Sequence, residues 1–117
     1  MAQYVILIYD DEAAVAESGT EVVDAIMRDH DRFVRTHQDQ VITSYRLRPG
    51  YAATSVRRTD GGELVVTDGV FTETKEVLGG LYLVDAPDLD GAISLAADVP
   101  APWGGVEVRP IWTDELR

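Results

Sequence analysis

The chain has 117 residues, a length that suits one compact domain, and it carries 21 Asp and Glu residues against 10 Lys and Arg. Its formal net charge of −11 argues against a protein that binds nucleic-acid phosphates or an anionic membrane surface, since both need clustered basic side chains. The absence of cysteine excludes disulfides, thiolate nucleophiles and Cys-ligated zinc, and it fits a cytoplasmic protein.

The first expected elements are a strand and a long helix. Residues 3–10 form an apolar, β-rich run that is too short to span a bilayer, so they predict a buried strand. Residues 11–18 are acidic and rich in alanine, and they predict a loop or a short helical turn. Ser18 and Glu21 have the spacing of a capping box, which would start a helix near residue 19 or 20 that runs to about Gln38.

The remainder of the chain predicts five further strands and a second helix. The sequence TDGG at 59–62 is a hairpin signal between two of these strands. Pro87 and Asp88 open the second helix, whose apolar residues fall on one face. The expected strands are residues 41–48, 53–58, 63–68, 77–86 and 105–112.

This order of elements predicts a single domain, residues 1–117, with an α+β fold. Two strand–helix–strand units form the split βαβ pattern of a ferredoxin-like sandwich, in which two helices cover one face of an antiparallel sheet. The first strand is apolar on both faces, with Val5 and Leu7 opposite Ile6 and Ile8. A sheet with a second apolar face needs another cover, and the simplest cover is a second copy of the chain. We therefore expect a homodimer.

The only two histidines, His30 and His37, lie seven residues apart in the long helix. At the helical period both fall on the apolar stripe with Ile26 and Phe33, so both should face the sheet. Either histidine could be a core-edge residue bonded to a backbone carbonyl. His30, in the middle of the helix, could instead act as a general base if a cleft reaches it. The spacing places the rings about 10 Å apart along the axis, too far to share one metal ion, and we expect no metal site.

The C-terminal half of the sequence carries a set of motifs. They are Asp68-Gly69-Val70-Phe71, the ETKE sequence at 73–76, a Gly-Gly-x-Tyr sequence ending at Tyr82, and VEVRP at 106–110. On these motifs the chain resembles the DGPF domain, a subgroup of the YCII-related superfamily whose Asp-Gly-Pro-Phe hallmark has valine here in place of proline. The resemblance implies a ferredoxin-like fold that pairs into a dimeric α+β barrel, and it implies no known reaction.

Members of the wider superfamily resemble a candidate enzyme that uses a His–Asp pair. Its histidine lies on the first helix, and its aspartate lies in an Asp-Pro-Tyr motif after the second helix. His30 occupies the helix position. Asp98 lies one position before the place of the aspartate, because Val99 precedes Pro100 here. The resemblance thus implies His30 as the acid/base and Asp98 as an orienting carboxylate.

Residues 68–76 have two readings. They could form a structural loop with a solvated charge run, or a loop that closes over a pocket where Lys75 or Arg109 receives an anionic group. The candidate ligand-binding residues are Asp68, Phe71, Lys75, Tyr82 and Arg109.

Three functional hypotheses follow. The first is a homodimer that binds a small molecule, without a cofactor, as an accessory to an extracytoplasmic-function sigma factor system; that association is implied by the resemblance. The alternative is a small-molecule enzyme of hydrolase or lyase type with His30 as general acid/base. The third is a structural dimer without a site. No nucleic-acid or membrane partner is expected for a chain this acidic.

Overall fold

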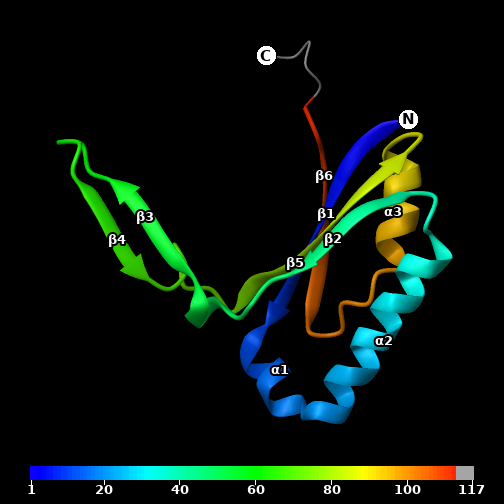
Figure 1. Cartoon of the computed structure of the whole chain (residues 1–117), viewed down its shortest axis with the longest axis horizontal. Coiled ribbons are helices and arrows are strands. Elements are labelled where there is room, and N and C mark those ends of the chain that lie inside the picture. The colour runs from blue at the N-terminus through cyan, green and yellow to red at the C-terminus, as the bar shows by residue number, and fades with distance from the viewer. Residues whose placement is uncertain (113–117) are drawn as a thin grey trace.

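A computed structural model describes residues 1–112 of the chain (Figure 1). The elements, in chain order, are β1 (Ala2–Asp11), α1 (Glu12–Ser18), α2 (Thr20–Thr36), β2 (Val41–Arg46), the 3-10 turn η1 (Gly50–Ala52), β3 (Thr54–Arg58), β4 (Leu64–Asp68), β5 (Glu76–Ala86), α3 (Leu89–Ala97) and β6 (Gly104–Pro110). None of the helices in this part of the chain is long and apolar enough to cross a lipid bilayer.

The central layer is a four-stranded antiparallel sheet in the order β2-β5-β1-β6, with the helices on one of its faces (Figure 1). The predicted α+β fold is confirmed, and this arrangement is compatible with a ferredoxin-like fold. Within residues 1–112 there are three α-helices where two were expected, because residues 12–18 form the short helix α1. Asp11 caps α1 by accepting a hydrogen bond from the backbone N–H of Ala14.

The core lies between the sheet and the helices, and strand alternation builds it. Every second residue of β1 and β5 points toward the helices, so one set of side chains is buried while the set between them stays half-exposed. Phe33 of α2 and Leu95 of α3 cover this set from the helix side. The buried strand residues are Tyr4, Ile6, Ile8, Tyr82, Val84 and Ala86.

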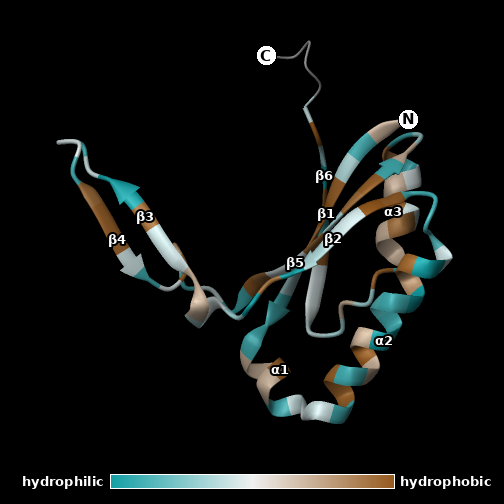
Figure 2. Cartoon of the chain, in the orientation of Figure 1, coloured by the Kyte–Doolittle hydropathy of each residue, from teal (hydrophilic) through white to brown (hydrophobic). Residues whose placement is uncertain are grey.

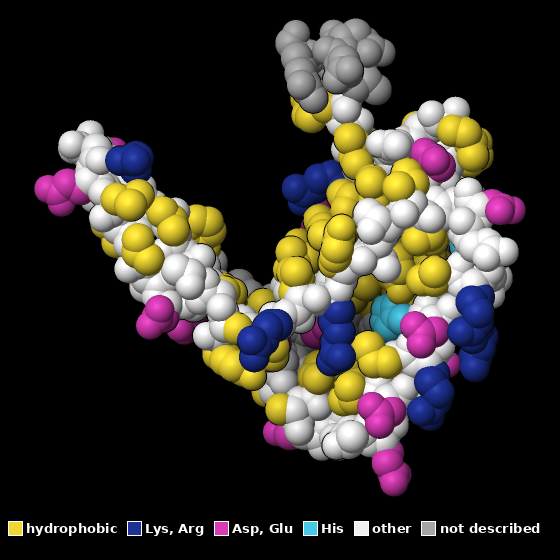
Figure 3. All heavy atoms as spheres, viewed as in Figure 1, with side chains coloured by type: hydrophobic (Ala, Val, Ile, Leu, Met, Phe, Trp, Pro, Cys, Tyr) yellow, Lys and Arg dark blue, Asp and Glu magenta, His cyan; other side chains and the backbone are white. Residues whose placement is uncertain are grey.

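Strands β3 and β4 form a separate hairpin that extends away from the main sheet (Figure 1). Its turn is closed by the backbone N–H of Thr59, which donates to the carbonyl of Glu63, and Gly62 has a positive φ of 86°. The predicted hairpin at 53–68 is thereby confirmed. Figure 2 shows apolar residues along β4, and Figure 3 shows hydrophobic side chains exposed on the same hairpin.

The extended hairpin gives the chain an open shape. The radius of gyration is 16.4 Å, whereas a compact chain of this length has about 13 Å. Val56, Leu64 and Val66 of the hairpin are 50%, 56% and 59% exposed. An isolated two-stranded hairpin is marginally stable in water, so a surface of this kind is expected to gain stability from further packing.

The start of α2 differs from the expected capping box. No side chain caps the helix, and Gly19, with a φ of 82°, occupies the N-cap position. The hydroxyl of Ser18 instead donates to the carbonyl of Ala14 and accepts from the indole N–H of Trp103. The capping-box prediction was therefore wrong, because Ser18 ends α1 and bonds backward. The far end of α2 also comes earlier than expected, at Thr36 with His37 as C-cap.

Candidate functional site

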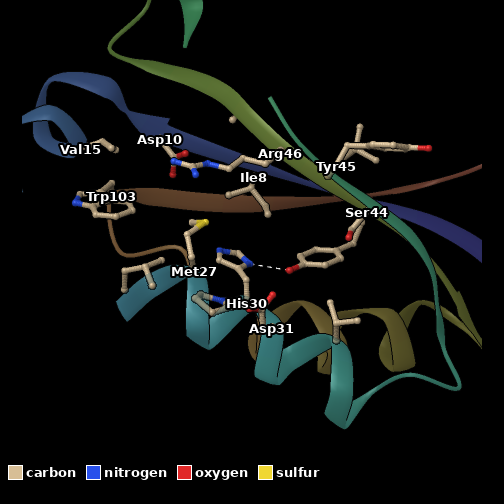
Figure 4. Close-up of a pocket in the computed structure, with 17 residues that line it drawn as sticks. Ile8, Asp10, Val15, Met27, His30, Asp31, Ser44, Tyr45, Arg46 and Trp103 are labelled. Atoms are coloured by element: carbon tan, nitrogen blue, oxygen red, sulfur yellow. Dashed lines mark hydrogen bonds between the residues drawn. The ribbon is translucent and has the colours of Figure 1, made fainter. Parts of the chain in front are cut away.

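A cavity of about 230 Å³ lies between α2 and the helix-covered face of the sheet (Figure 4). One part of its wall is apolar and comes from β1, α1, α2 and the segment before β6. These residues are Ile8, Val15, Ile26, Met27, Val34 and Trp103. The other part is polar: Asp10, His30, Asp31, Ser44, Arg46 and Tyr82. A mainly apolar hollow with a few converging polar groups is the usual form of a small-molecule site.

His30 faces this cavity from the middle of α2, as its position on the apolar stripe predicts. Its Nδ1 lies 2.7 Å from the hydroxyl of Tyr82 on β5, and the two rings are nearly parallel with centroids 5.9 Å apart. Burial lowers the pKa of His30 below 6.5, against the field of Asp29, which raises it. Burial also raises the pKa of Tyr82 to about 12, with a further contribution from the charge of Asp31. Both rings are therefore neutral at pH 7.

These neutral states allow the shared proton to be assigned. The hydroxyl of Tyr82 belongs to a residue that is only 4% exposed, and its one hydrogen-bond partner among residues 1–112 is Nδ1 of His30. A buried phenol whose proton has one available acceptor donates to that acceptor. We therefore assign Nδ1 of His30 as the acceptor, which puts the ring proton on Nε2. The carbonyl of Pro100 is consistent with this tautomer, because a carbonyl accepts a hydrogen bond from a ring nitrogen that carries a proton.

Asp10 brings a carboxylate to the same cavity. It continues the alternation of Tyr4, Ile6 and Ile8, so it occupies a helix-facing position at the end of β1. The β1–β5 register shifts between Ile8 and Tyr9, which leaves Gly79 as an extra residue on β5. A side chain at Gly79 would clash with the Asp10 carboxylate, so the glycine provides the room for that group. Burial raises the pKa of Asp10, while Arg46 opposes the shift.

Arg46 lies at the end of β2, opposite Gly80 of β5, and it lines the cavity with Asp10 (Figure 4). Its positive charge lowers the pKa of both Asp10 and His30, so its field reaches across this end of the cavity. Gly80 is also tightly packed, because a Cβ there would lie 2.9 Å from the carbonyl oxygen of Tyr45. The Gly79-Gly80 pair thus lets β2 and Asp10 approach β5 closely.

The expected pairing of His30 with Asp98 is absent from the described residues. The carboxylate of Asp98 instead lies 3.1 Å from Nε2 of His37, outside the cavity, and its side chain is 62% exposed. The backbone N–H of His37 donates to the carbonyl of Phe33 and so ends α2. The two histidines therefore have different surroundings: His30 faces the cavity with Tyr82, and His37 closes the helix with Asp98.

Residues 68–76 lie at the base of the hairpin. The backbone N–H of Gly69, with a φ of 98°, donates to the carbonyl of Ala53, which holds the exit from β4 at Asp68. Phe71 is 60% exposed and lies under the guanidinium of Arg57, whose Cζ is 4.2 Å from the ring centroid. This segment supplies none of the residues that line the cavity.

The last two candidates carry surface ion pairs. The ammonium group of Lys75 lies 3.7 Å from a carboxylate oxygen of Asp11, and Arg109 on β6 pairs with Glu107. Of the predicted site residues, His30 and Tyr82 line the cavity, whereas Asp98, Asp68, Phe71, Lys75 and Arg109 do not. Asp10 and Arg46 were missed. The alternation of β1 is the signal that could have found Asp10, because it puts a carboxylate on the buried face.

Comparison with known proteins gives the family. A family model for the YCII-related domain matches residues 2–114. The chain belongs to the YCII-related domain family. This YCII-related protein is also 36% identical over 113 residues to a Rhizobium meliloti (strain 1021) protein named Uncharacterized protein R00369, a match that covers 92% of this chain and 90% of the relative. These findings place the chain in a family, and they assign no reaction to it.

Proposed function

We propose that this YCII-related protein binds a small molecule in the cavity beside His30. The observation that carries the proposal is the hydrogen-bonded His30–Tyr82 pair on the cavity wall. In the tautomer assigned above, Nε2 of His30 carries a proton that a ligand acceptor would receive in competition with the carbonyl of Pro100. The surrounding Ile26, Met27 and Trp103 supply an apolar surface for the body of the ligand.

The binding unit in this proposal is a homodimer. The sheet face opposite the helices carries the half-exposed Val5, Leu7, Leu81 and Leu83, and Tyr45 on the same face is 62% exposed. A second copy packed sheet to sheet would cover this face and would also offer a surface to the hairpin. An obligate interface of this kind buries about 2,000 Å² or more in total.

A second candidate function is catalysis of hydrolase or lyase type with His30 as general acid/base. The short contact between His30 and Tyr82 favours it, because a second group that holds the imidazole is a common feature of catalytic histidines. This role needs the opposite tautomer, in which Nδ1–H donates to the Tyr82 oxygen and Nε2 is bare. Asp98 takes no part in this version, since its carboxylate lies on His37.

Two finer parts of the proposal rest on the resemblance alone. The motifs from Asp68 to Tyr82 support membership of the DGPF subgroup, with Val70 as the one departure from the hallmark. An accessory role in an extracytoplasmic-function sigma factor system would then make the bound small molecule a regulatory signal. That role predicts that the tagged protein co-purifies with such a sigma factor. Failure of the two proteins to co-purify, with and without a compound from the ligand screen, would contradict it.

The binding function is tested by a small-molecule screen that compares two histidine variants. Ligand-observed NMR should find compounds that bind the wild-type chain and His37→Asn equally, because His37 lies outside the cavity. The same compounds should lose about tenfold or more in affinity to His30→Asn, which removes one hydrogen-bonding nitrogen from the wall. Equal binding to all three proteins would place the ligands elsewhere, and the absence of any binder would contradict the proposal.

A further inference from the structure

We propose that the Asp10–Arg46 end of the cavity holds the head group of a small carboxylic acid that bears a hydroxyl or amino group next to its carboxylate. Arg46 would pair with the carboxylate, and Asp10 would accept a hydrogen bond from the hydroxyl or amino group. This inference rests on the proposed binding function, because it names the ligand class for the same cavity. It uses two residues that play no part in the His30–Tyr82 pair.

The carboxylate of Asp10 is the first feature that points to this ligand class. Within residues 1–112 its carboxylate takes part in neither a hydrogen bond nor an ion pair, although it is half-buried between β5 and the cavity. No side-chain nitrogen or oxygen of the described residues is sealed from solvent without a partner, so the oxygens of Asp10 keep some contact with solvent, and Asp10 lines the cavity. A carboxylate that has lost part of its hydration gains most from a donor placed there, and a hydroxyl or amino group is such a donor.

The guanidinium of Arg46 is the second such feature. Its charge acts on Asp10 and on His30, yet among the described residues it forms no ion pair within 4.0 Å. Within residues 1–112, Arg46 is exposed and unpaired like Arg28 and Arg48, but unlike them it lines the cavity. The planar guanidinium binds carboxylates through two parallel hydrogen bonds, and that fork is free on Arg46.

The size of the cavity and its apolar lining are the third such feature. The cavity of about 230 Å³ is smaller than the range of about 300–1,000 Å³ that is usual for drug-sized ligands. Its apolar part, with Ile26, Met27 and Trp103, can cover a short branched hydrocarbon chain. Asp31 is a second carboxylate on the wall, carried by α2. At the end of the cavity where Asp10 and Arg46 lie together (Figure 4), one cation and one carboxylate favour a compact acid with a neighbouring hydrogen-bond donor.

The test uses three probes that share one branched carbon skeleton. They are 2-hydroxy-4-methylpentanoate, 4-methylpentanoate, which lacks the donor, and 2-hydroxy-4-methylpentanamide, which lacks the anion. Affinity is measured from the shifts of the His30 ring resonances on titration. The hydroxy acid should bind about tenfold or more tightly than either of the other two, since each lacks one charge-assisted hydrogen bond.

Variants then assign each preference to its residue. Arg46→Met, which keeps an unbranched side chain, should abolish the preference for the acid over the amide. Asp10→Leu, which is close to aspartate in shape, should abolish the preference for the hydroxy acid over the plain acid. Arg48→Met is the matched control, because it removes a nearby exposed arginine that does not line the cavity, and both preferences should remain.

Several results would overturn the inference. Equal affinity of the wild type for the three probes would do so, as would a loss in Arg46→Met that is the same for acid and amide. If the amide shifts His30 and the acids do not, the cavity binds small molecules and only this ligand class is wrong. If no probe shifts His30 while the screened compounds do, this inference likewise fails and the binding function stands.

Discussion

Replacing Tyr82 with phenylalanine removes one atom from the centre of the candidate site. The variant keeps the buried ring and loses the hydroxyl that lies 2.7 Å from Nδ1 of His30. A hydrogen bond of this kind contributes about 1 kcal/mol to folding. For 117 residues, an unfolding entropy of about 2.1 cal/mol/K per residue converts that loss into a Tm lower by about 4 °C.

The same variant tests the direction of the hydrogen bond. If the hydroxyl donates to Nδ1, it stabilises the neutral imidazole, and its removal must raise the pKa of His30 from its lowered value. NMR titration of the His30 ring in wild type and Tyr82→Phe measures this directly, and the ring of His37 is the internal control. A fall in the pKa of His30 would refute the assigned tautomer, and it would favour the general-base role instead.

Four further predictions concern stability and assembly. A carboxyl with a raised pKa, such as Asp10, contributes stability at low pH, and this contribution is lost as the pH rises through that pKa. Asp10→Asn should therefore be more stable than the wild type at neutral pH, and urea unfolding should show that this advantage is lost near pH 3.8. The lowered pKa of His30 has the opposite effect on stability, because its contribution to the free energy of unfolding is present above pH 6.5 and is lost as the pH falls. His30→Leu should therefore make the free energy of unfolding depend less on pH below pH 6.5. Light scattering of the wild type at micromolar concentration should give about twice the chain mass of 12.8 kDa. Leu83→Glu places a charge on the open sheet face and should give the mass of the monomer. A wild-type mass that stays at the monomer value at all concentrations would contradict the dimer. Lys75→Met should change the free energy of unfolding by less than about 0.5 kcal/mol, because the Lys75 side chain is 84% exposed and its contact with Asp11 is long, at 3.7 Å. A change in probe affinity in this variant would bring the 68–76 segment into the site.

The sequence predicted the fold well because its strands and helices have clear periods. The alternation of β1 and β5 and the apolar stripe of α2 each fix which side chains face the core, and the structure confirms that His30 lies on the sheet side. Element ends were predicted less well. Ser18 and Glu21 have capping-box spacing, but the hydroxyl of Ser18 is engaged by Ala14 and by Trp103, which is distant in the sequence.

The site itself depends on contacts that a linear pattern does not contain. The partner of His30 is Tyr82, 52 positions away in the sequence, and it is brought near by the packing of α2 on β5. The position of Asp98 suggested a pair with His30, but the path of the chain after α3 brings its carboxylate to His37. The sequence predicts only that Asp10 ends a strand. In the structure, the bulge at Gly79 makes room for its carboxylate on the buried face of the sheet.

The central claim is that the cavity beside His30 receives a small molecule, and the two tryptophans test it most directly. Trp103 lines the cavity, whereas Trp112 is 70% exposed. In a two-dimensional NMR titration with a compound from the screen, we expect the indole signal of Trp103 and the ring signals of His30 to shift together along one saturable curve. The signals of Trp112 and His37 should stay in place. Shifts confined to Trp112 or His37, or none at Trp103 at saturating compound, would contradict it.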